Sequence, residues 1–136
     1  MKNFLFAVII ALVVALSANC SAYDYDHDPN YVFIVSGDVA FTYFYTPSVE
    51  VQEYNPPHYQ IAGQFVRVGL LDERVEHFKV TMRYNWHTKE VFTRTIEGRW
   101  EKAHVSDEAD SVLARGNART ANAMFKAAYG INFYGY

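Results

Sequence analysis

The feature that most constrains the fold is a strict alternation of large apolar and polar side chains at residues 78–87. The apolar members are Phe78, Val80, Met82, Tyr84 and Trp86, and the polar members are Lys79, Thr81, Arg83, Asn85 and His87. A period of two places successive side chains on opposite faces of an extended chain, whereas a helix would scatter them around its axis. We therefore predict a strand with one buried and one wet side, which is typical of antiparallel sheets.

An earlier part of the chain predicts a β-hairpin. Tyr31–Ser36 and Val39–Tyr45 are rich in aromatic and β-branched residues and flank a Gly-Asp pair that favours a tight turn. Thr46–Ser48 contains a proline, which lacks a backbone donor, so we expect it to break this hairpin. Val49–Tyr54 alternates again and carries charge, and it is predicted to be a short edge strand.

Two longer extended segments complete the predicted sheet. His58–Leu71 is predicted to be a strand that ends in a charged turn at Asp72–Glu76. Glu90–Trp100 is rich in Val, Thr, Phe and Ile, and we expect it to return as one strand. It would pair with residues 78–86 in a second hairpin, across a turn at His87–Lys89.

The pattern becomes helical toward the end of the chain. Ser106 is predicted to cap a short helix with Asp107 and Glu108 in its first turn, where the helix dipole favours acidic side chains. Arg115–Gly116 is predicted to end this helix, because glycine tolerates the left-handed conformation found at helix ends.

A second helix is predicted from about Ala118 to Tyr129, capped by Asn117 and stopped by Gly130. Its apolar face consists of Ala121, Met124, Phe125 and Ala128, at helical spacing. Strands followed by helices predict an α+β domain, with an antiparallel sheet of about five to six strands and a C-terminal helix packed on one face.

Residues 1–22 have the pattern of a secretory signal peptide. A basic start at Lys2 precedes an apolar run over residues 4–18, and small residues lead to Ala22. This run is shorter than the roughly 20 residues that span a bilayer comfortably. We expect export, to the periplasm, the cell surface or the medium, with the leader removed after Ala22.

The only cysteine, Cys20, lies inside this leader. A lipid anchor on Cys20 is an alternative, although Ser17 and Asn19 replace the branched apolar and small residues expected before a lipidated cysteine. Cleavage next to Cys20 is a further alternative. If the leader is removed after Ala22, the remaining chain has no cysteine and must be stabilised by its core alone.

The remaining 114 residues suit one domain with one core. Residues 23–30 are predicted to be a flexible acidic lead-in, and residues 31–136 to be a single α+β domain. The chain after the leader has a net charge of −4 and no basic block, which argues against a nucleic-acid partner. It also holds no predicted transmembrane span.

Motifs for catalysis or metal binding are weak. One possible metal-binding cluster consists of Asp24, Asp26, His27 and Asp28. It lacks the glycine and the distal glutamate of a calcium loop, so a solvated acidic linker is the favoured interpretation. The other histidines have no zinc-site spacing, no Gly-x-Ser-x-Gly elbow is present, and no glycine-rich phosphate loop appears. We predict no enzymatic activity and no cofactor.

Tyrosines are the most promising binding residues. A tyrosine offers an apolar ring and a hydroxyl, which suits protein interfaces and sugar stacking. Four of them flank the proline-containing turns and are predicted to form a binding surface: Tyr43, Tyr45, Tyr54 and Tyr59. The alternative is that a small domain without disulfides uses its large rings to fill the core.

The order of these segments resembles small bacterial exported domains of the surface-adhesin protein E type. The resemblance lies in the leader, the hairpin Tyr31–Tyr45, the tyrosine-rich turn Tyr43–Ser48, the paired strands Phe78–Trp100 and the closing helix that ends at Gly130. It implies a sheet with a packed helix and a role in contact with other macromolecules. Such domains can tie helix to sheet with a disulfide, which this chain would lack after removal of the leader.

We therefore expect an exported, non-enzymatic binding domain with an adhesin-like role and an extracellular or envelope macromolecule as its partner. The alternative is a structural or accessory subunit of the cell envelope. Such a subunit would assemble through an exposed sheet edge, for which Val49–Tyr54 is the candidate.

Overall fold

The computed structural model describes residues 22–106 and 111–136. The predicted leader up to Ser21, with Cys20, and the predicted first-turn acids Asp107 and Glu108 lie outside the described residues.

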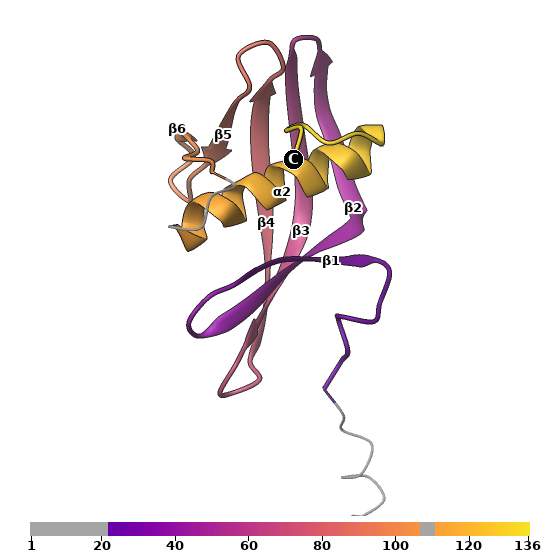
Figure 1. Ribbon diagram of the computed structural model, residues 1–136, viewed down its shortest axis with the longest axis vertical. Helices are drawn as coiled ribbons and strands as arrows, with labels where there is room; N and C mark the ends of the chain where they lie inside the picture. The colour runs from indigo at the N-terminus through magenta and orange to yellow at the C-terminus, as the bar shows by residue number, and fades with distance from the viewer. Residues whose placement is uncertain (1–21, 107–110) are drawn as a thin grey trace, which may run out of the picture.

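Six strands form one antiparallel sheet in which neighbours follow chain order (Figure 1). They are β1 (Tyr31–Ser36), β2 (Ala40–Asn55), β3 (His58–Gly69), β4 (Val75–Asn85), β5 (Glu90–Arg94) and β6 (Trp100–Lys102). One helix, α2 (Val112–Tyr129), follows and lies across one face of the sheet. The predicted α+β fold, with its C-terminal helix on an antiparallel sheet, is confirmed.

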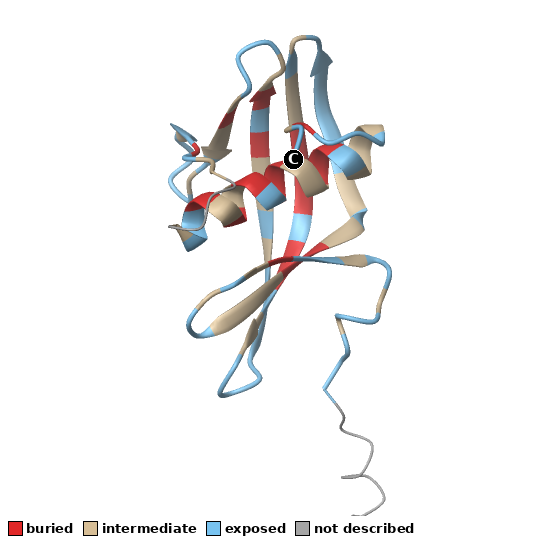
Figure 2. Ribbon diagram, in the orientation of Figure 1, coloured by how far each residue is buried: buried red, intermediate tan, exposed pale blue. Residues whose placement is uncertain are grey.

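The core lies between α2 and the sheet face that it covers, where Figure 2 shows the buried positions gathered. Phe44 and Phe65 meet across β2 and β3 with ring centroids 5.0 Å apart, and both are buried. The ring centroids of Phe125 in α2 and Tyr84 in β4 lie 5.2 Å apart, and the Tyr84 hydroxyl donates to the Ala121 carbonyl at 3.1 Å. Burying each such ring contributes about 1.5–3 kcal/mol, so this contact holds the helix on the sheet.

The prediction of two C-terminal helices is wrong, because α2 runs through Gly116 and Asn117. Ser111 is the N-cap and accepts from the Ala114 N–H at 3.2 Å. Gly116 is buried against Val35 of β1, and an added Cβ would lie 3.5 Å from that side chain, at ordinary van der Waals distance. Asn117 does not cap a helix; its amide donates to the His104 carbonyl at 3.0 Å.

The predicted break at Thr46–Ser48 is also wrong, because β2 is continuous from Ala40 to Asn55. The ladder with β3 shifts register between Tyr45 and Glu50, which places the proline at an irregularity where it need not donate. The Ser48 hydroxyl donates to the Tyr45 carbonyl at 2.6 Å and accepts from the Gln64 N–H at 2.7 Å. A side chain thus satisfies backbone groups that the ladder leaves unpaired.

The predicted strand Glu90–Trp100 is two strands, since β5 ends at Arg94 and β6 begins at Trp100. Between them the chain turns at Gly98, whose φ of 84° favours glycine. The Gly98 N–H donates to the Thr95 carbonyl at 2.9 Å, and the Thr95 N–H donates to the Arg99 carbonyl at 2.8 Å.

β1 carries a bulge that directs it toward the helix. Its register with β2 shifts between Phe33 and Val35, and Ile34 is the extra residue. Ile34 is buried in the core, and its carbonyl accepts from the Arg119 guanidinium of α2 at 3.1 Å. The bulge therefore fastens β1 to α2 and fixes which face of β1 remains outside.

Candidate binding site on the outer face of the first hairpin

Aromatic rings line the face of β1 and β2 that points away from α2. The register pairs Tyr31 with Tyr45 and Phe33 with Tyr43, and the ring centroids of these pairs lie 5.0 Å and 5.7 Å apart. Phe41 adds a further ring, 6.2 Å from that of Phe33. These side chains share a face because residues two apart on a strand point the same way, whereas Phe44, one residue on from Tyr43, lies in the core.

The segment before β1 extends this surface. The Tyr25 ring stacks on Tyr43 with centroids 5.3 Å apart, and its edge meets Tyr31 at 4.9 Å. Tyr23 meets Tyr25 at 4.7 Å. Seven rings are thereby in continuous contact, and we call them the tyrosine face: Tyr23, Tyr25, Tyr31, Phe33, Phe41, Tyr43 and Tyr45. The predicted flexibility of residues 23–30 stays a prediction, but the rings of this segment contact the sheet.

Carboxylates border the tyrosine face. The Tyr43 hydroxyl donates to Asp26 Oδ1 at 2.9 Å, and the Tyr23 hydroxyl donates to Asp28. Burial and then the hydrogen bond to Asp26 raise the pKa of Tyr43 to about 12, so its proton stays in place at neutral pH. The hydrogen bond from Tyr23 lowers the pKa of Asp28, which keeps that carboxylate charged.

The four predicted binding tyrosines do not form one surface. Tyr43 and Tyr45 belong to the tyrosine face, but Tyr43 is only 5% exposed and forms its floor. Tyr54 and Tyr59 lie on the helix side of the sheet, with ring centroids 5.9 Å and 5.4 Å from that of Tyr129 in α2. The sequence prediction therefore identified two residues of the tyrosine face and missed the more exposed rings of Tyr23 and Phe33.

A signal for the missed residues exists in the sequence. Tyr23 and Tyr25, and likewise Tyr31 and Phe33, are spaced by two, which places each pair on one side of an extended chain. The prediction of a flexible lead-in at residues 23–30 left Tyr23 and Tyr25 out of the predicted binding surface.

Tyr54 and Tyr59 line a cavity of about 190 Å³ at the C-terminal end of α2. Trp86, Phe125 and Tyr129 contribute to its wall. The Tyr129 hydroxyl is buried and has no hydrogen-bond partner within the described part of the chain, and burial raises its pKa. The Trp86 ring also makes a cation–π contact, because Lys89 Nζ lies 3.1 Å from its centroid.

A groove of about 600 Å³ lies between the first turns of α2 and the sheet. Phe65, Phe78 and Met82 are among its lining residues, and Val112 and Leu113 of α2 are exposed beside it at 44% and 72%. Polar side chains also line this groove, among them Arg67, Arg94 and Asn117, so it offers polar groups beside its apolar wall.

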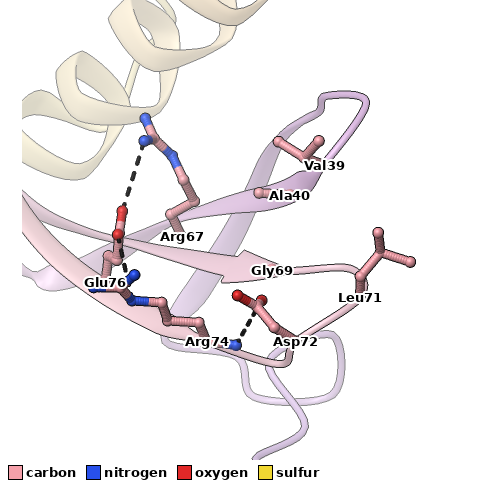
Figure 3. A pocket seen from close by; sticks show the side chains of 8 residues that line it. All are labelled: Val39, Ala40, Arg67, Gly69, Leu71, Asp72, Arg74 and Glu76. Atoms are coloured by element: carbon pink, nitrogen blue, oxygen red, sulfur yellow. Dashed lines mark hydrogen bonds and ion pairs between the residues drawn. The ribbon is translucent and has the colours of Figure 1, made fainter.

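A third hollow, of about 370 Å³, lies at the end of the sheet where β3 turns into β4 (Figure 3). Glu76 stands between Arg67 and Arg74, with nitrogen-to-oxygen distances of 3.8 Å to each, and Asp72 accepts from the Arg74 N–H at 3.1 Å. These charged side chains are exposed and pair with one another, which is the usual arrangement in a solvated turn.

The acidic cluster at residues 24–28, for which a solvated linker was the favoured interpretation, is divided among separate partners. His27 Nδ1 lies 2.6 Å from Asp24 Oδ2, whereas Asp26 and Asp28 accept from Tyr43 and Tyr23. Within residues 22–106 and 111–136, no group of three or more His, Cys, Asp and Glu side chains is placed to hold a metal ion.

Residues 49–55 of β2 form an open sheet edge, since β1 pairs only with residues 41–45. This edge has a second register shift between Val51 and Glu53. Irregular ladders and charged residues such as Glu50 are devices by which proteins prevent edge-to-edge pairing.

Comparison of the chain with protein families, with curated proteins and with solved structures gives no match. In the described part of the chain, no helix combines the length and the apolar character that a membrane crossing requires.

Proposed function

We propose that this chain is an exported, non-enzymatic binding domain with an adhesin-like role, and that it contacts an extracellular or envelope macromolecule through the tyrosine face. The observation that carries the proposal is the continuous contact of seven aromatic rings on the side of the sheet opposite the core. The core has its own rings, including Phe44, Phe65 and Phe125, so those of the tyrosine face are not needed to fill it.

The composition of this surface supports the proposal. Tyr23 is 58% exposed and Phe33 is 41% exposed, while Tyr43 beneath them is buried. Exposed aromatic groups on a rigid sheet lose little conformational entropy on binding and are common energetic centres of protein interfaces.

Binding of the labelled domain to envelopes from the producing cells tests this proposal. Tyr23→Ala and Phe33→Ala should each weaken binding by roughly tenfold or more, the loss expected for interface hot spots. The matched controls are Leu71→Ala and Ile96→Ala, which truncate exposed apolar side chains in turns outside the tyrosine face. Equal losses in the controls and the test variants would refute the assignment of the site.

Export is tested separately, by intact-mass measurement of the protein recovered from fractionated cells. A mass beginning at Tyr23 supports removal of the leader. A lipid on Cys20 in a membrane fraction would replace that interpretation with an anchored protein tethered by residues 23–30. An unprocessed chain in the cytoplasm would contradict the proposal.

Assembly through a sheet edge is the second candidate function, and the open edge at residues 49–55 favours it. Its register shift and its glutamates weaken the case, because both features oppose pairing with another strand. Sedimentation at high concentration distinguishes the two proposals. A self-association that Val51→Pro abolishes would support edge assembly, and a monomer would argue against assembly between copies of the chain.

A further inference from the structure

We propose that the partner of the tyrosine face is a cationic segment of a protein, whose arginine or lysine side chains lie on the rings and pair with the bordering aspartates. This inference rests on the proposed function and adds the chemistry of the ligand. It follows from the distribution of charge along the chain, the free acceptor capacity of the carboxylates and the observation that, among the described residues, the cation–π contacts involve other rings.

Charge is divided sharply along the chain. Residues 23–66 contain no lysine and no arginine, and every lysine and arginine after the leader lies at Arg67 or beyond. The same stretch contains six acidic residues: Asp24, Asp26, Asp28, Asp38, Glu50 and Glu53. The segment before β1 and the β1–β2 hairpin, which together form the tyrosine face, therefore carry a net negative charge, even with the single α-amino group that removal of the leader would leave at Tyr23, and their field attracts cations.

The carboxylates at this face have acceptor capacity to spare. Asp26 Oδ1 accepts from the Tyr43 hydroxyl at 2.9 Å, and Asp24 contacts His27. Asp28 accepts from the Tyr23 hydroxyl and from the Asn30 N–H at 2.8 Å. Because an ionised carboxylate offers about four lone-pair positions, each can still accept from a guanidinium or an ammonium group.

The rings supply the second half of the site. The negative face of an aromatic ring attracts a cation, and arginine stacks on such rings readily. Elsewhere the chain makes this contact internally, since the Arg83 guanidinium carbon lies 4.0 Å from the centroid of Trp100. The cation–π contacts among the described residues all involve rings outside the tyrosine face, namely Phe78, Trp86, Trp100 and Phe133.

Cations from the rest of the sheet do not neutralise this surface. Lys79 is the cation on the adjoining part of the outer face, and its Nζ already lies 3.3 Å from Glu50 Oε2. Arg67 contacts Glu76, and its guanidinium carbon lies 5.2 Å from the ring centroid of Phe78. A cationic partner is therefore favoured over a nucleic acid or an anionic membrane, which this negative surface repels.

The test is titration with a short Gly/Ser peptide that carries arginine at alternate positions, measured by calorimetry. The comparison peptide carries citrulline, which keeps the planar group and removes the charge. We expect the arginine peptide to bind roughly tenfold or more tightly than the citrulline peptide. Affinity should fall steeply as the ionic strength rises from about 0.05 M to about 0.5 M, since exposed charges are then screened.

Two classes of variant locate the site. Asp24→Asn with Asp28→Asn removes two charges from the tyrosine face, while Glu97→Gln with Glu101→Gln removes two charges from β6 and the turn before it. The first pair should weaken binding of the arginine peptide by about tenfold, and the second by about twofold at most. Phe33→Ala should also weaken it, by roughly threefold to tenfold.

The outcomes separate this inference from the proposed function. If Phe33→Ala abolishes envelope binding while the two peptides bind equally, the tyrosine face is the site but its ligand is uncharged, as a carbohydrate would be. If both charge-removing pairs weaken the arginine peptide equally, the attraction is general and the inference is overturned. If the variants of the tyrosine face weaken binding of the arginine peptide but leave envelope binding unchanged, the proposed function fails.

Discussion

Truncation of Phe125 tests whether the described core stabilises the domain. Phe125 is 2% exposed, and its ring centroid lies 4.8–5.4 Å from those of five other aromatic residues. They are Tyr59, Tyr84, Trp86, Tyr129 and Phe133, which come from β3, β4, the turn after β4, α2 and the C-terminal segment. Phe125→Ala therefore removes a contact shared by several elements, and because the surrounding rings are anchored in different elements they cannot collapse fully into the cavity.

The expected loss is about 3–5 kcal/mol in the free energy of unfolding, the usual cost of Phe→Ala in a core. A domain of this size has a total stability of roughly 6–17 kcal/mol, at about 0.05–0.15 kcal/mol per residue. Urea unfolding followed by circular dichroism measures the change. With a slope of about 2 kcal/mol per molar, the midpoint should fall by about 2 M.

Phe33→Ala is the matched control, because it makes the same chemical change on the tyrosine face. The Phe33 side chain is 41% exposed, and among the described aromatic rings its centroid lies near those of Phe41 and Tyr43, at 6.2 Å and 5.7 Å. We expect this variant to lose at most about 1.5 kcal/mol, the contribution of an exposed aromatic pair. If Phe125→Ala costs no more than Phe33→Ala, the helix does not pack on the sheet as described.

Three further predictions concern the backbone and pH. Gly63→Ala should destabilise the domain by about 1–3 kcal/mol in urea unfolding, because its Cβ would lie 2.6 Å from Phe44 Cε2, and a loss below about 0.5 kcal/mol would contradict this packing. Ser111→Ala should cost about 1 kcal/mol by removing the N-cap of α2, whereas Ser111→Asp should restore most of it. Since the pKa of Tyr43 rises from 10.0 to about 12 on folding, its contribution to stability is complete below about pH 10 and is lost as pH rises to about 12. Tyr43→Phe should flatten this decline in thermal unfolding and remove a late component from the tyrosinate absorbance titration, and an unchanged titration would refute the burial of Tyr43.

Local rules of sequence predicted much of this fold. The alternation at residues 78–87 marks a strand because a wet face and a buried face are both visible in the residue types, and β4 covers Val75–Asn85. The hairpin of β1 and β2, the strand β3 and the stop at Gly130 follow from residues whose preferences act within a few positions. Each of these features needs only neighbours in the sequence to be favourable.

The errors arise where a distant contact overrides a local preference. Gly116 looks like the end of a helix, yet it lies inside α2, at a buried position where the helix packs near Val35 of β1. Pro47 looks like the end of a strand, yet β2 continues because Ser48 bonds to Gln64 of the neighbouring strand. Neither partner can be identified from local sequence, since Val35 and Gly116 are about eighty residues apart and Ser48 and Gln64 lie 16 positions apart on different strands.

The predicted break at Pro47 also explains why Tyr54 was grouped with Tyr43 and Tyr45, although it lies on the opposite face of the sheet. From Tyr45 to Tyr54 the chain advances nine residues on β2, while the paired positions from Gln64 to Tyr59 span five on β3. The two register shifts thus give β2 four more residues than β3 over this stretch. Because four is even, odd-numbered residues at the two ends of β2 lie on one face of the sheet and even-numbered residues on the other. A continuous β2 therefore places Tyr54 on the side opposite Tyr43 and Tyr45, and the predicted break at Pro47 removed the basis for that inference. The binding proposal must consequently be tested on rings that share a face with Tyr43, of which Tyr23 and Phe33 are the exposed members.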